Sequence, residues 1–211
     1  MAGRPNGHMA FTRSAAHLPP RSTRARIGLF GGSFDPPHPG HLHVAETAMK
    51  RLGLDQVWWF PTPGNPLKEA PSDYQARFDG VSELTRHNRR FHVSDIERRV
   101  GLRYTVDLVA MLKDHCPEAG LVWIMGGDSL TNFHHWKDWR ALTEMIPVAV
   151  VARPGYEIAA RSSPFAQKLS RHRLAGDAAL ALPRRTAPAW VYLPAPLNPT
   201  SSTAIREARH D

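Results

Sequence analysis

Two histidines in one short loop are the residues of this chain best suited to chemistry. His38 and His41 lie three positions apart in the stretch 31–41, which reads GGSFDPPHPGH. An imidazole N–H that donates to phosphate in a charge-assisted hydrogen bond contributes about 1.5–3 kcal/mol. The two glycines that open the stretch lack Cβ atoms and let a phosphate approach the main chain. The loop therefore predicts a site for a polyphosphate nucleotide.

The surroundings of the loop favour phosphate binding over two simpler interpretations, a plain helix cap and a zinc site. Histidines that merely flank a helix cap would be solvated, and zinc would need a third and a fourth ligand that the sequence does not offer nearby. However, the apolar run 27–30 ends at the glycines, and helical spacing follows the loop at Leu42, Ala45, Met49 and Leu52. The N-terminus of such a helix supplies free N–H groups and positive dipole potential. This order of strand, glycine loop and helix favours phosphate binding.

A second candidate phosphate element lies near the end of the sequence. Residues 200–206 read TSSTAIR, so Ser201, Ser202 and Thr203 can cap a helix while they present hydroxyl groups. Arg206 follows one turn later, and its planar guanidinium matches the geometry of a phosphate. Alone, this pattern is typical of an ordinary N-cap. Together with the first loop it predicts a two-sided clamp for a triphosphate.

Apolar runs and helical periodicities alternate between these two elements. Strands are expected at 27–30, 56–60, 91–93, 121–125, 148–151 and 190–193, and helices at 42–52, 74–85, 105–113, 130–145, 165–171 and from Thr203 onward. Because successive parallel strands need crossovers, the alternation predicts an α/β fold, a Rossmann-like doubly wound, mostly parallel sheet with helices on both faces. Ligands bind at the carboxyl ends of the strands in such sheets. The loops 31–40, 61–71 and 126–129 should therefore border one crevice.

Charge separates a leader from a folded body. Residues 1–25 mix Pro, Ser, Arg and Gly without periodicity and are expected to be a flexible basic leader, with a single domain over 26–211. The formal net charge is +8, and five arginines without an acidic residue in the first 26 positions supply +5 of it. A nucleic-acid-binding module is therefore the alternative from another class of function. No helix-turn-helix, zinc or aromatic RNA-binding signature accompanies the charge, so we expect no nucleic-acid partner.

The sequence also bears on membranes and compartment. It has no run of eighteen apolar residues, and its N-terminal stretch lacks the apolar core of a signal peptide. Cys116 is the one cysteine of the chain, which excludes an internal disulfide and favours a reducing compartment. We therefore expect a cytoplasmic protein with no membrane partner. The sequence is compatible with a homo-oligomer.

The two phosphate elements resemble the signatures of the nucleotidyltransferase superfamily, which shares a His-x-Gly-His element with class I aminoacyl-tRNA synthetases. Residues 200–206 are similar to its second motif, Ile-Ser-Ser-Thr-x-Ile-Arg, with Thr200 where Ile is usual. The resemblance implies one ATP-binding nucleotidyltransferase domain in which His38 and His41 hold the α- and β-phosphates. The other implied phosphate contacts, to the β- and γ-phosphates, are Ser202, Thr203 and Arg206. The remaining ATP-binding set is Gly31, Gly32, Ser33, Phe34, Gly40, Gly126, Asp128 and Ser129.

Four intervening segments resemble bacterial nicotinate mononucleotide adenylyltransferases, in the same order along the chain. They read PGNPLK at 63–68, RYT at 103–105, MGGDSL at 125–130 and ARPGY at 152–156. The resemblance implies that Asp128 contacts a nucleotide ribose and that Thr105 helps recognise the nicotinate carboxylate. It also implies that Trp136 stacks on the pyridine ring, with Trp139 as the competing candidate. The other implied substrate-binding residues are Asn65, Lys68 and Arg153.

The chain departs from the pattern of this family at a few places. Gly127 stands where Ala is usual, and Arg103 stands where Ser is usual, at the rim of the expected pocket. The sequence ends at Asp211, earlier than in many members of the family, which puts oligomeric contacts in doubt more than chemistry. The nearest alternative enzyme is a phosphopantetheine adenylyltransferase, which shares the first loop but lacks the Arg-Pro-Gly-Tyr element. A tRNA synthetase fragment is disfavoured because no Lys-Met-Ser-Lys-Ser-like loop occurs.

The implied partners are ATP and nicotinate mononucleotide, and the implied reaction is adenylyl transfer between them. The nucleophile is a phosphate and already an anion, so catalysis needs positioning and charge stabilisation rather than a protein nucleophile. Mg²⁺ is expected to arrive with ATP, held mainly by phosphate oxygens and water. This fits a sequence without a dedicated carboxylate cage, and no metal site made by the protein alone is expected.

Overall fold

The computed structural model describes residues 24–64, 72–195, 202 and 205, and this part of the chain forms a seven-stranded sheet. The strands are β1 (Arg26–Gly32), β2 (Gln56–Pro61), β3 (Phe91–Val93), β4 (Gly120–Gly126), β5 (Val148–Val151), β6 (Arg173–Leu174) and β7 (Trp190–Leu193). Their order across the sheet is β3-β2-β1-β4-β5-β7-β6, and every neighbouring pair is parallel. The predicted doubly wound sheet is thereby confirmed.

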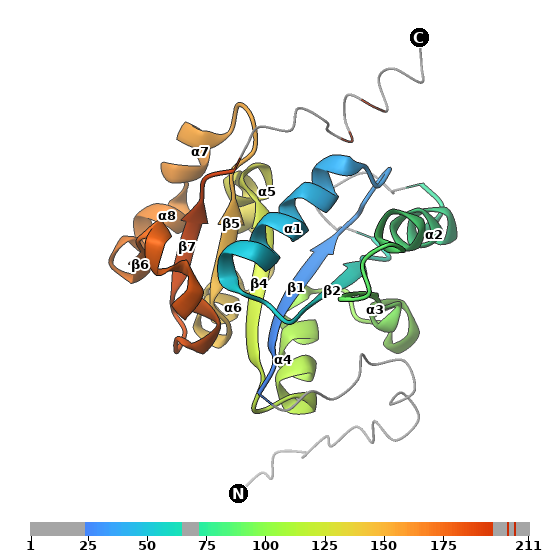
Figure 1. The fold of residues 1–211 in the computed structure, drawn as a ribbon, viewed down its shortest axis with the longest axis horizontal. Helices are drawn as coiled ribbons and strands as arrows, with labels where there is room; N and C mark the ends of the chain where they lie inside the picture. Colours follow the sequence, from blue (N-terminus) through green and yellow to red (C-terminus); the bar gives the residue numbers. More distant parts are fainter. Residues whose placement is uncertain (1–23, 65–71, 196–201, 203–204, 206–211) are drawn as a thin grey trace, which may run out of the picture.

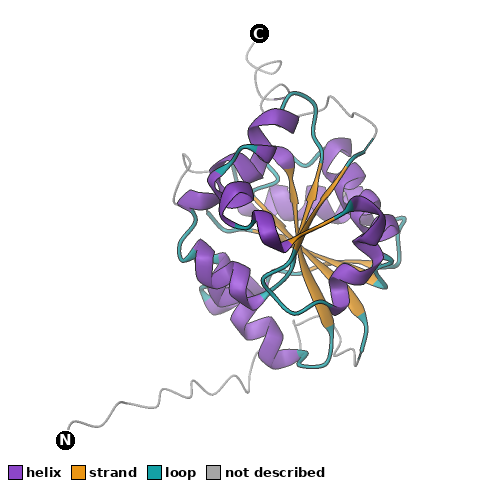
Figure 2. Ribbon diagram, turned by 90° about the vertical axis from the view of Figure 1, so that its left-hand side faces the viewer, coloured by secondary structure: helices purple, strands orange, loops and turns teal. Residues whose placement is uncertain are grey.

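Helices cover both faces of the sheet (Figures 1 and 2). One face carries α1 (Pro39–Leu52), α2 (Tyr74–Thr85) and the 3-10 segment η3 (Gly176–Arg184). The opposite face carries α3 (Ile96–Val100), α4 (Thr105–His115), α5 (Gly127–Asn132), η1 (Phe133–His135), α6 (Trp139–Met145), α7 (Glu157–Arg161) and α8 (Pro164–Lys168). A further 3-10 turn, η2 (Ser170–His172), leads into β6.

Adjacent residues of the central strands pack on opposite faces. Leu29 belongs to the core beneath α4, whereas Phe30 belongs to the core beneath α1. Trp58 and Trp59 divide in the same way, and both are fully buried. Apolar side chains in succession are what a parallel sheet covered on both faces requires. A register slip of one residue would exchange the two faces, so these rings fix the strand positions.

The helix after the first loop ends where the sequence predicts. Gly53 follows Leu52 with φ of 60°, a left-handed conformation that favours glycine, and its N–H donates to the carbonyl of Met49. All six predicted strands are present. The predicted helix 130–145 is helical for most of its length but broken into α5, η1 and α6, and Asp138 before α6 has φ of 50°.

The described part of the structure contains four elements that the sequence did not predict. These are the five-residue helices α3 and α7, the two-residue strand β6 and the 3-10 segment η3. The helices α3 and α7 and the strand β6 are too short to show a regular spacing of apolar residues. The segment η3 is a 3-10 helix, which lacks the period of about 3.6 residues of an α-helix. The predicted helix 165–171 is instead the shorter α8 followed by η2. Ser202 and Ile205 are helical, and Thr203, from which the last helix was predicted, lies outside the described residues.

The order of the strands creates a switch point between β1 and β4. From β1 the chain proceeds outward to β2 and β3, and from β4 it proceeds outward in the other direction to β5 and β7. The loops after β1 and β4 therefore leave the carboxyl edge side by side and on opposite faces, which is where open α/β sheets bind ligands.

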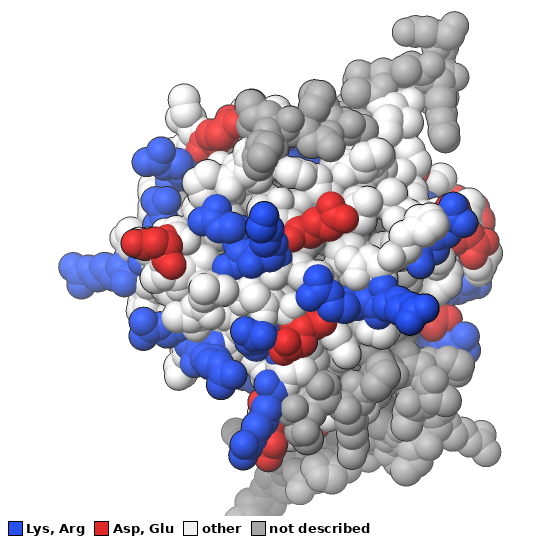
Figure 3. Space-filling view, in the orientation of Figure 1, with Lys and Arg blue, Asp and Glu red and all other residues white. Residues whose placement is uncertain are grey.

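The described surface carries charges of both signs. Figure 3 shows Lys and Arg side chains interspersed with Asp and Glu on the face of α1. One such pair joins Nη2 of Arg26 to Oδ1 of Asp55 at 2.9 Å. Among the described residues, no helix is long and apolar enough to cross a membrane.

Candidate active site

The two histidines of the first loop form a reciprocal cap at the start of α1. Nδ1 of His38 accepts a hydrogen bond from the N–H of Gly40 at 3.0 Å, and Nδ1 of His41 accepts from the N–H of His38 at 3.3 Å. The two rings lie close, with centroids 3.8 Å apart. Because Nδ1 accepts in each ring, a neutral imidazole here carries its proton on Nε2. The cap therefore fixes a tautomer that leaves Nε2–H as the donor.

His38 is the more sheltered of the two. It is 2% exposed, and its Nε2 has no hydrogen-bond partner among the described residues. Burial lowers its pKa to about 4, helped by the positive charge of Arg153 and opposed by the carboxylate of Asp128. At neutral pH the ring is therefore a neutral N–H donor rather than a cation. The sequence left the protonated and neutral forms open, and the structure favours the neutral one.

The glycines of the loop are required by packing as well as by the expected ligand. A Cβ on Gly31 would meet the ring of Trp123 at 2.6 Å, and a Cβ on Gly32 would meet the ring of Phe34 at 3.3 Å. Phe34 itself is 2% exposed and packs edge-on against His41 at 5.0 Å between ring centroids. Its ring belongs to the core, so of the expected ATP contacts at Phe34 only the main chain remains. Its φ of 48° is unusual for a residue with a side chain.

An ion pair between a buried arginine and a partly exposed carboxylate lies at the adjoining end of β4. Nε of Arg153 is 3.7 Å from Oδ1 of Asp128, and Arg153 is 8% exposed. A Cβ on Gly126 would collide with the Asp128 carboxylate and lie 3.2 Å from Cγ of Arg153, so this glycine makes room for the pair. Ser129 follows on α5 and is partly buried. Both charges act on the pKa of His38, Arg153 lowering it and Asp128 raising it.

The structure separates the two tryptophans proposed for the acceptor. Trp139 is 8% exposed and packs among Phe133 and Phe165, so it is a core residue. Trp136 is only partly buried, and its ring meets Trp123 edge-on at 6.1 Å between centroids. The ring of Trp123 also fills the space above Gly31. Trp136 therefore lies near the carboxyl edge of the sheet and remains the predicted stacking residue.

Thr105 begins α4 on the same side of the sheet as Trp136. It is partly buried and follows Tyr104, the N-cap residue of the helix. Because α4 leads to the start of β4 at the amino edge, its first residue faces the carboxyl edge. The position fits the predicted contact with the acceptor, which stays a prediction.

The far end of the chain returns to the first loop. Oγ of Ser202 donates to the carbonyl oxygen of Pro36 at 3.0 Å, across 166 positions of sequence. The hydroxyl is thereby placed on the loop that carries the two histidines, as the two-sided clamp requires. The other predicted contacts Asn65, Lys68, Thr203 and Arg206 lie outside the described residues, and their roles stay predictions.

Two buried charged residues were not predicted from the sequence. Arg77, on α2, is 2% exposed and donates to three main-chain carbonyls of the two loops that follow β1 and β2. Glu97, on α3, is 6% exposed, and burial raises its pKa to about 8. The charged side chain of an arginine or a glutamate on a helix usually points into solvent, so nothing in the local pattern marked either residue.

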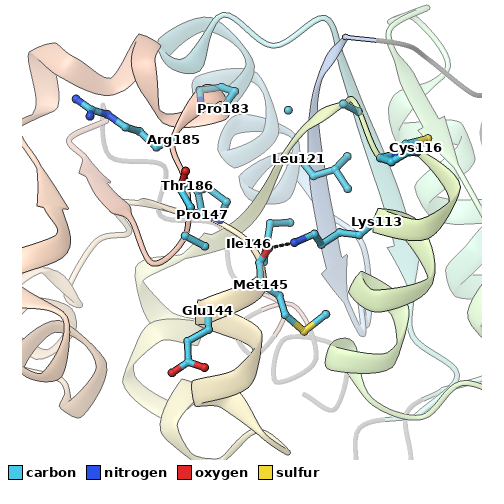
Figure 4. A pocket seen from close by; sticks show the side chains of 14 residues that line it. Lys113, Cys116, Leu121, Glu144, Met145, Ile146, Pro147, Pro183, Arg185 and Thr186 are labelled. Carbon is cyan, nitrogen blue, oxygen red and sulfur yellow. Dashed lines mark hydrogen bonds between the residues drawn. The ribbon is translucent and has the colours of Figure 1, made fainter.

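A hollow of about 200 Å³ lies at the opposite edge of the sheet and does not belong to this site. Figure 4 shows Lys113, Cys116 and Leu121 among its lining residues, with Nζ of Lys113 donating to the carbonyl of Met145 at 2.7 Å. Leu121 is near the start of β4, whereas the histidine cap adjoins the end of β4. Cys116 is a free, buried thiol, in agreement with the absence of an internal disulfide.

Comparisons with known proteins agree with this geometry. The family described as cytidylyltransferase-like matches residues 29–208. The "Probable nicotinate-nucleotide adenylyltransferase" of Ruegeria pomeroyi is 49% identical over 86% of this chain and 85% of its own length. Proteins of the same name from Caulobacter sp. and Rhizobium meliloti are 48% and 46% identical, over 86% and 87% of this chain and 96% and 98% of their own.

Solved structures share the architecture. Plasmodium falciparum nicotinic acid mononucleotide adenylyltransferase complexed with NaAD has a TM-score of 0.65 and 16% identity, over 86% of this chain and 82% of that one. The fold, the switch point between β1 and β4 and the histidine loop therefore define a nucleotidyltransferase of the cytidylyltransferase-like family. Within that family, the chain belongs to the nicotinate-nucleotide adenylyltransferases.

Proposed function

We propose that this protein transfers the adenylyl group of ATP to nicotinate mononucleotide, a step in the biosynthesis of NAD. The observation that carries the proposal is the neutral His38, whose unpartnered Nε2–H lies at the N-terminus of α1 beside Arg153. Hydrogen-bond donors held at the start of a helix in a switch-point crevice suit a polyphosphate. The high identity to curated adenylyltransferases supports nicotinate mononucleotide as the acceptor.

The reaction is an in-line displacement at the α-phosphorus of ATP. A phosphate oxygen of the mononucleotide forms the new P–O bond, the bond to the bridging oxygen breaks, and pyrophosphate leaves with the electron pair. Both nucleotides are anions, so the protein must bring them together and stabilise the charge on the phosphoryl oxygens. His38 and His41 donate to those oxygens, and Ser202, whose hydroxyl donates to the carbonyl of Pro36 in the free protein, turns this O–H to the phosphates when ATP binds.

Magnesium enters this scheme with ATP. Among the described residues there is no group of three His, Cys, Asp or Glu side chains that could hold a metal ion. The nearby carboxylate of Asp128 faces Arg153. We therefore propose that phosphate oxygens and water hold Mg²⁺ and that the ion lowers the repulsion between the two nucleotides.

The acceptor is proposed to lie on the α4 side of the sheet. Trp136 offers an exposed part of its indole ring for stacking on the pyridine, and Thr105 offers a hydroxyl at the start of α4. Stacked aromatic pairs contribute about 0.5–1.5 kcal/mol beyond the area that they bury. Because the substrates are soluble nucleotides of central metabolism, we also propose that the protein is cytoplasmic.

The test is a comparison of acceptors. The full chain is incubated with ATP, Mg²⁺ and either nicotinate mononucleotide, nicotinamide mononucleotide or 4′-phosphopantetheine, and pyrophosphate release is measured. We expect release with nicotinate mononucleotide at a kcat/KM at least about tenfold above the others, since a carboxylate contact of about 1.4 kcal/mol suffices for that ratio. Turnover of 4′-phosphopantetheine alone would establish the alternative enzyme, and turnover of none would refute both.

A further inference from the structure

Helix α2 carries a buried arginine for which the proposed chemistry has no use. The Arg77 guanidinium donates through Nη1 to the carbonyls of Ser33 at 2.6 Å and Thr62 at 2.9 Å, and through Nε to that of Ser72 at 3.0 Å. Nη2 makes a longer contact of 3.5 Å to the carbonyl of Pro63. A buried cation is costly unless its donors are satisfied, and here main-chain oxygens satisfy them.

These carbonyls belong to segments that border the candidate site. Ser33 is the first residue after β1, Thr62 is the first after β2, and Ser72 lies just before α2. The two loops also touch directly, because the N–H of Thr62 donates to the carbonyl of Gly32 at 2.9 Å. The planar guanidinium fork is suited to hold several acceptors in fixed directions, which a lysine ammonium is not. Arg77 therefore ties the first two strand-end loops to each other.

The bond to Ser33 also sets the direction of the next peptide. The Ser33–Phe34 peptide is trans, and in a trans peptide the C=O and N–H point to opposite sides. With the Ser33 carbonyl held on Arg77, the N–H of Phe34 points away from α2. The ring of Phe34 is buried, so this N–H is the group that the residue can offer to a phosphate.

A second contact braces the same loop one turn further along α2. A Cβ on Gly80 would come within 2.7 Å of Cγ of Pro37, so the helix backbone lies directly against this proline. Pro37 immediately precedes His38, the cap residue of α1. Between the two contacts, the carboxylate of Asp35 accepts a hydrogen bond from the N–H of Ser72 at 3.0 Å. Helix α2 thus supports the loop at its beginning and its end, and Ser72, just before the helix, supports its middle.

We propose that Arg77 is a positioning residue for adenylyl transfer, which holds the loop 33–38 in the conformation that aims the His38 imidazole and the Phe34 N–H at the phosphates. The proposal rests on the proposed function for its chemistry. Arg77 itself touches no reacting atom. It acts through the loop, so its loss should change turnover and nucleotide affinity more than it changes the folded state.

The direct test compares Arg77→Met and Arg77→Lys with wild type and with a control, Arg86→Met. Arg86 lies at the exposed end of α2 and pairs only with Glu83 in the described structure. We expect the Arg77 variants to lose about 10–100-fold in kcat, because small displacements of reacting groups cost factors of this size. The control should stay within about twofold. Arg77→Lys should recover most of the Tm lost by Arg77→Met but little of the kcat.

A second variant keeps the proposal open to refutation if Arg77→Met fails to fold. Gly80→Ala adds one methyl against Pro37 and, at the same time, improves the helix propensity of α2. We expect kcat to fall severalfold with only a small change in Tm, whereas Glu83→Ala on the exposed face of α2 should leave both unchanged. If Arg77→Lys and Gly80→Ala both keep kcat and KM within threefold of wild type, Arg77 has no positioning role.

Binding of a non-hydrolysable ATP analogue separates this proposal from the proposed function. Calorimetry measures its Kd without any acceptor, and we expect Arg77→Lys to weaken it about tenfold while Arg86→Met does not. If wild type binds the analogue but turns over no nicotinate mononucleotide, the acceptor assignment fails and the Kd comparison still tests the loop. An unchanged Kd and an unchanged kcat in Arg77→Lys would overturn the positioning role.

Discussion

The two sides of the crevice are built in different ways. On the phosphate side, the loop 33–38 is pinned by a reciprocal histidine cap, a buried arginine and a proline packed on a helix. On the acceptor side, residues 127–145 form three short helical pieces, with Asp138 in a left-handed conformation between them. Trp136 there is only partly buried. The phosphate groups are shared by all reactions of this kind, whereas the acceptor is particular, so the loop with these contacts lies where the chemistry is common.

The largest expected effect concerns the phosphate side. His41→Ala removes one donor to the phosphoryl oxygens and also the acceptor for the His38 N–H. We expect kcat to fall about 10²–10³-fold, the usual cost of one transition-state donor. Steady-state kinetics of the purified variant measures it, with the exposed His87→Ala as the control. A kcat within threefold of wild type would show that the cap has no catalytic role.

The two sides should also differ in how their stability depends on pH. Glu97 lies on the acceptor face, and its pKa of about 8 exceeds the ordinary 4.5, because burial disfavours the charged form. The folded state therefore binds the Glu97 proton more tightly than the unfolded state does. The stability that this proton contributes is fully present below pH 4.5 and is lost as pH rises to about 8. We expect the free energy of unfolding to fall over this window by on the order of a few kcal/mol.

Urea denaturation at pH 5 and pH 8.5 measures this loss, and Glu97→Gln should flatten the dependence. The exposed Glu144→Gln is the control and should behave like wild type. Equal pH dependence of wild type and Glu97→Gln would contradict the assignment of Glu97 as a buried, neutral acid.

A smaller effect separates the two tryptophans of the acceptor side. Trp136→Ala should raise the KM for nicotinate mononucleotide about two- to tenfold and leave the KM for ATP nearly unchanged, since loss of stacking is worth about 0.5–1.5 kcal/mol. Trp139→Phe should lower Tm and change neither KM, because its ring packs in the core. Equal increases in both KM values for Trp136→Ala would argue against stacking on the pyridine.

The last prediction concerns the pKa of His38 and needs no kinetic measurement. NMR titration of the free enzyme should show His38 with a pKa near 4, below its ordinary 6.5. Because the pKa of His38 is lower in the folded state, the unfolded state binds the proton more tightly. The contribution of the neutral ring to stability is therefore fully present above pH 6.5 and is lost as pH falls toward 4. His38 and Glu97 thus act in opposite directions. A His38 pKa above 7 would mean that a cation, and not a neutral donor, meets the phosphates at neutral pH.

Two kinds of feature could be predicted from the sequence: strands, which show as runs of apolar residues, and residues whose type suits a particular chemistry. The strands were found because consecutive apolar residues such as Trp58 and Trp59 serve two buried faces. The histidines were found because their spacing and glycine context suit phosphate. Arg77 was missed because its partners are main-chain oxygens, which carry no residue type to read. The break at Asp138 was missed because the flanking apolar spacing continues through it.

Trp123 has a consequence for how the two sides work together. Its indole fills the space above Gly31 and meets Trp136 edge-on, so one rigid ring separates the phosphate loop from the proposed pyridine platform. If Trp136 stacks on the pyridine as proposed, the width of this ring contributes to the distance between the phosphate site and the pyridine site. A smaller side chain at position 123 would then change the spacing of the two nucleotides as well as the packing of the core.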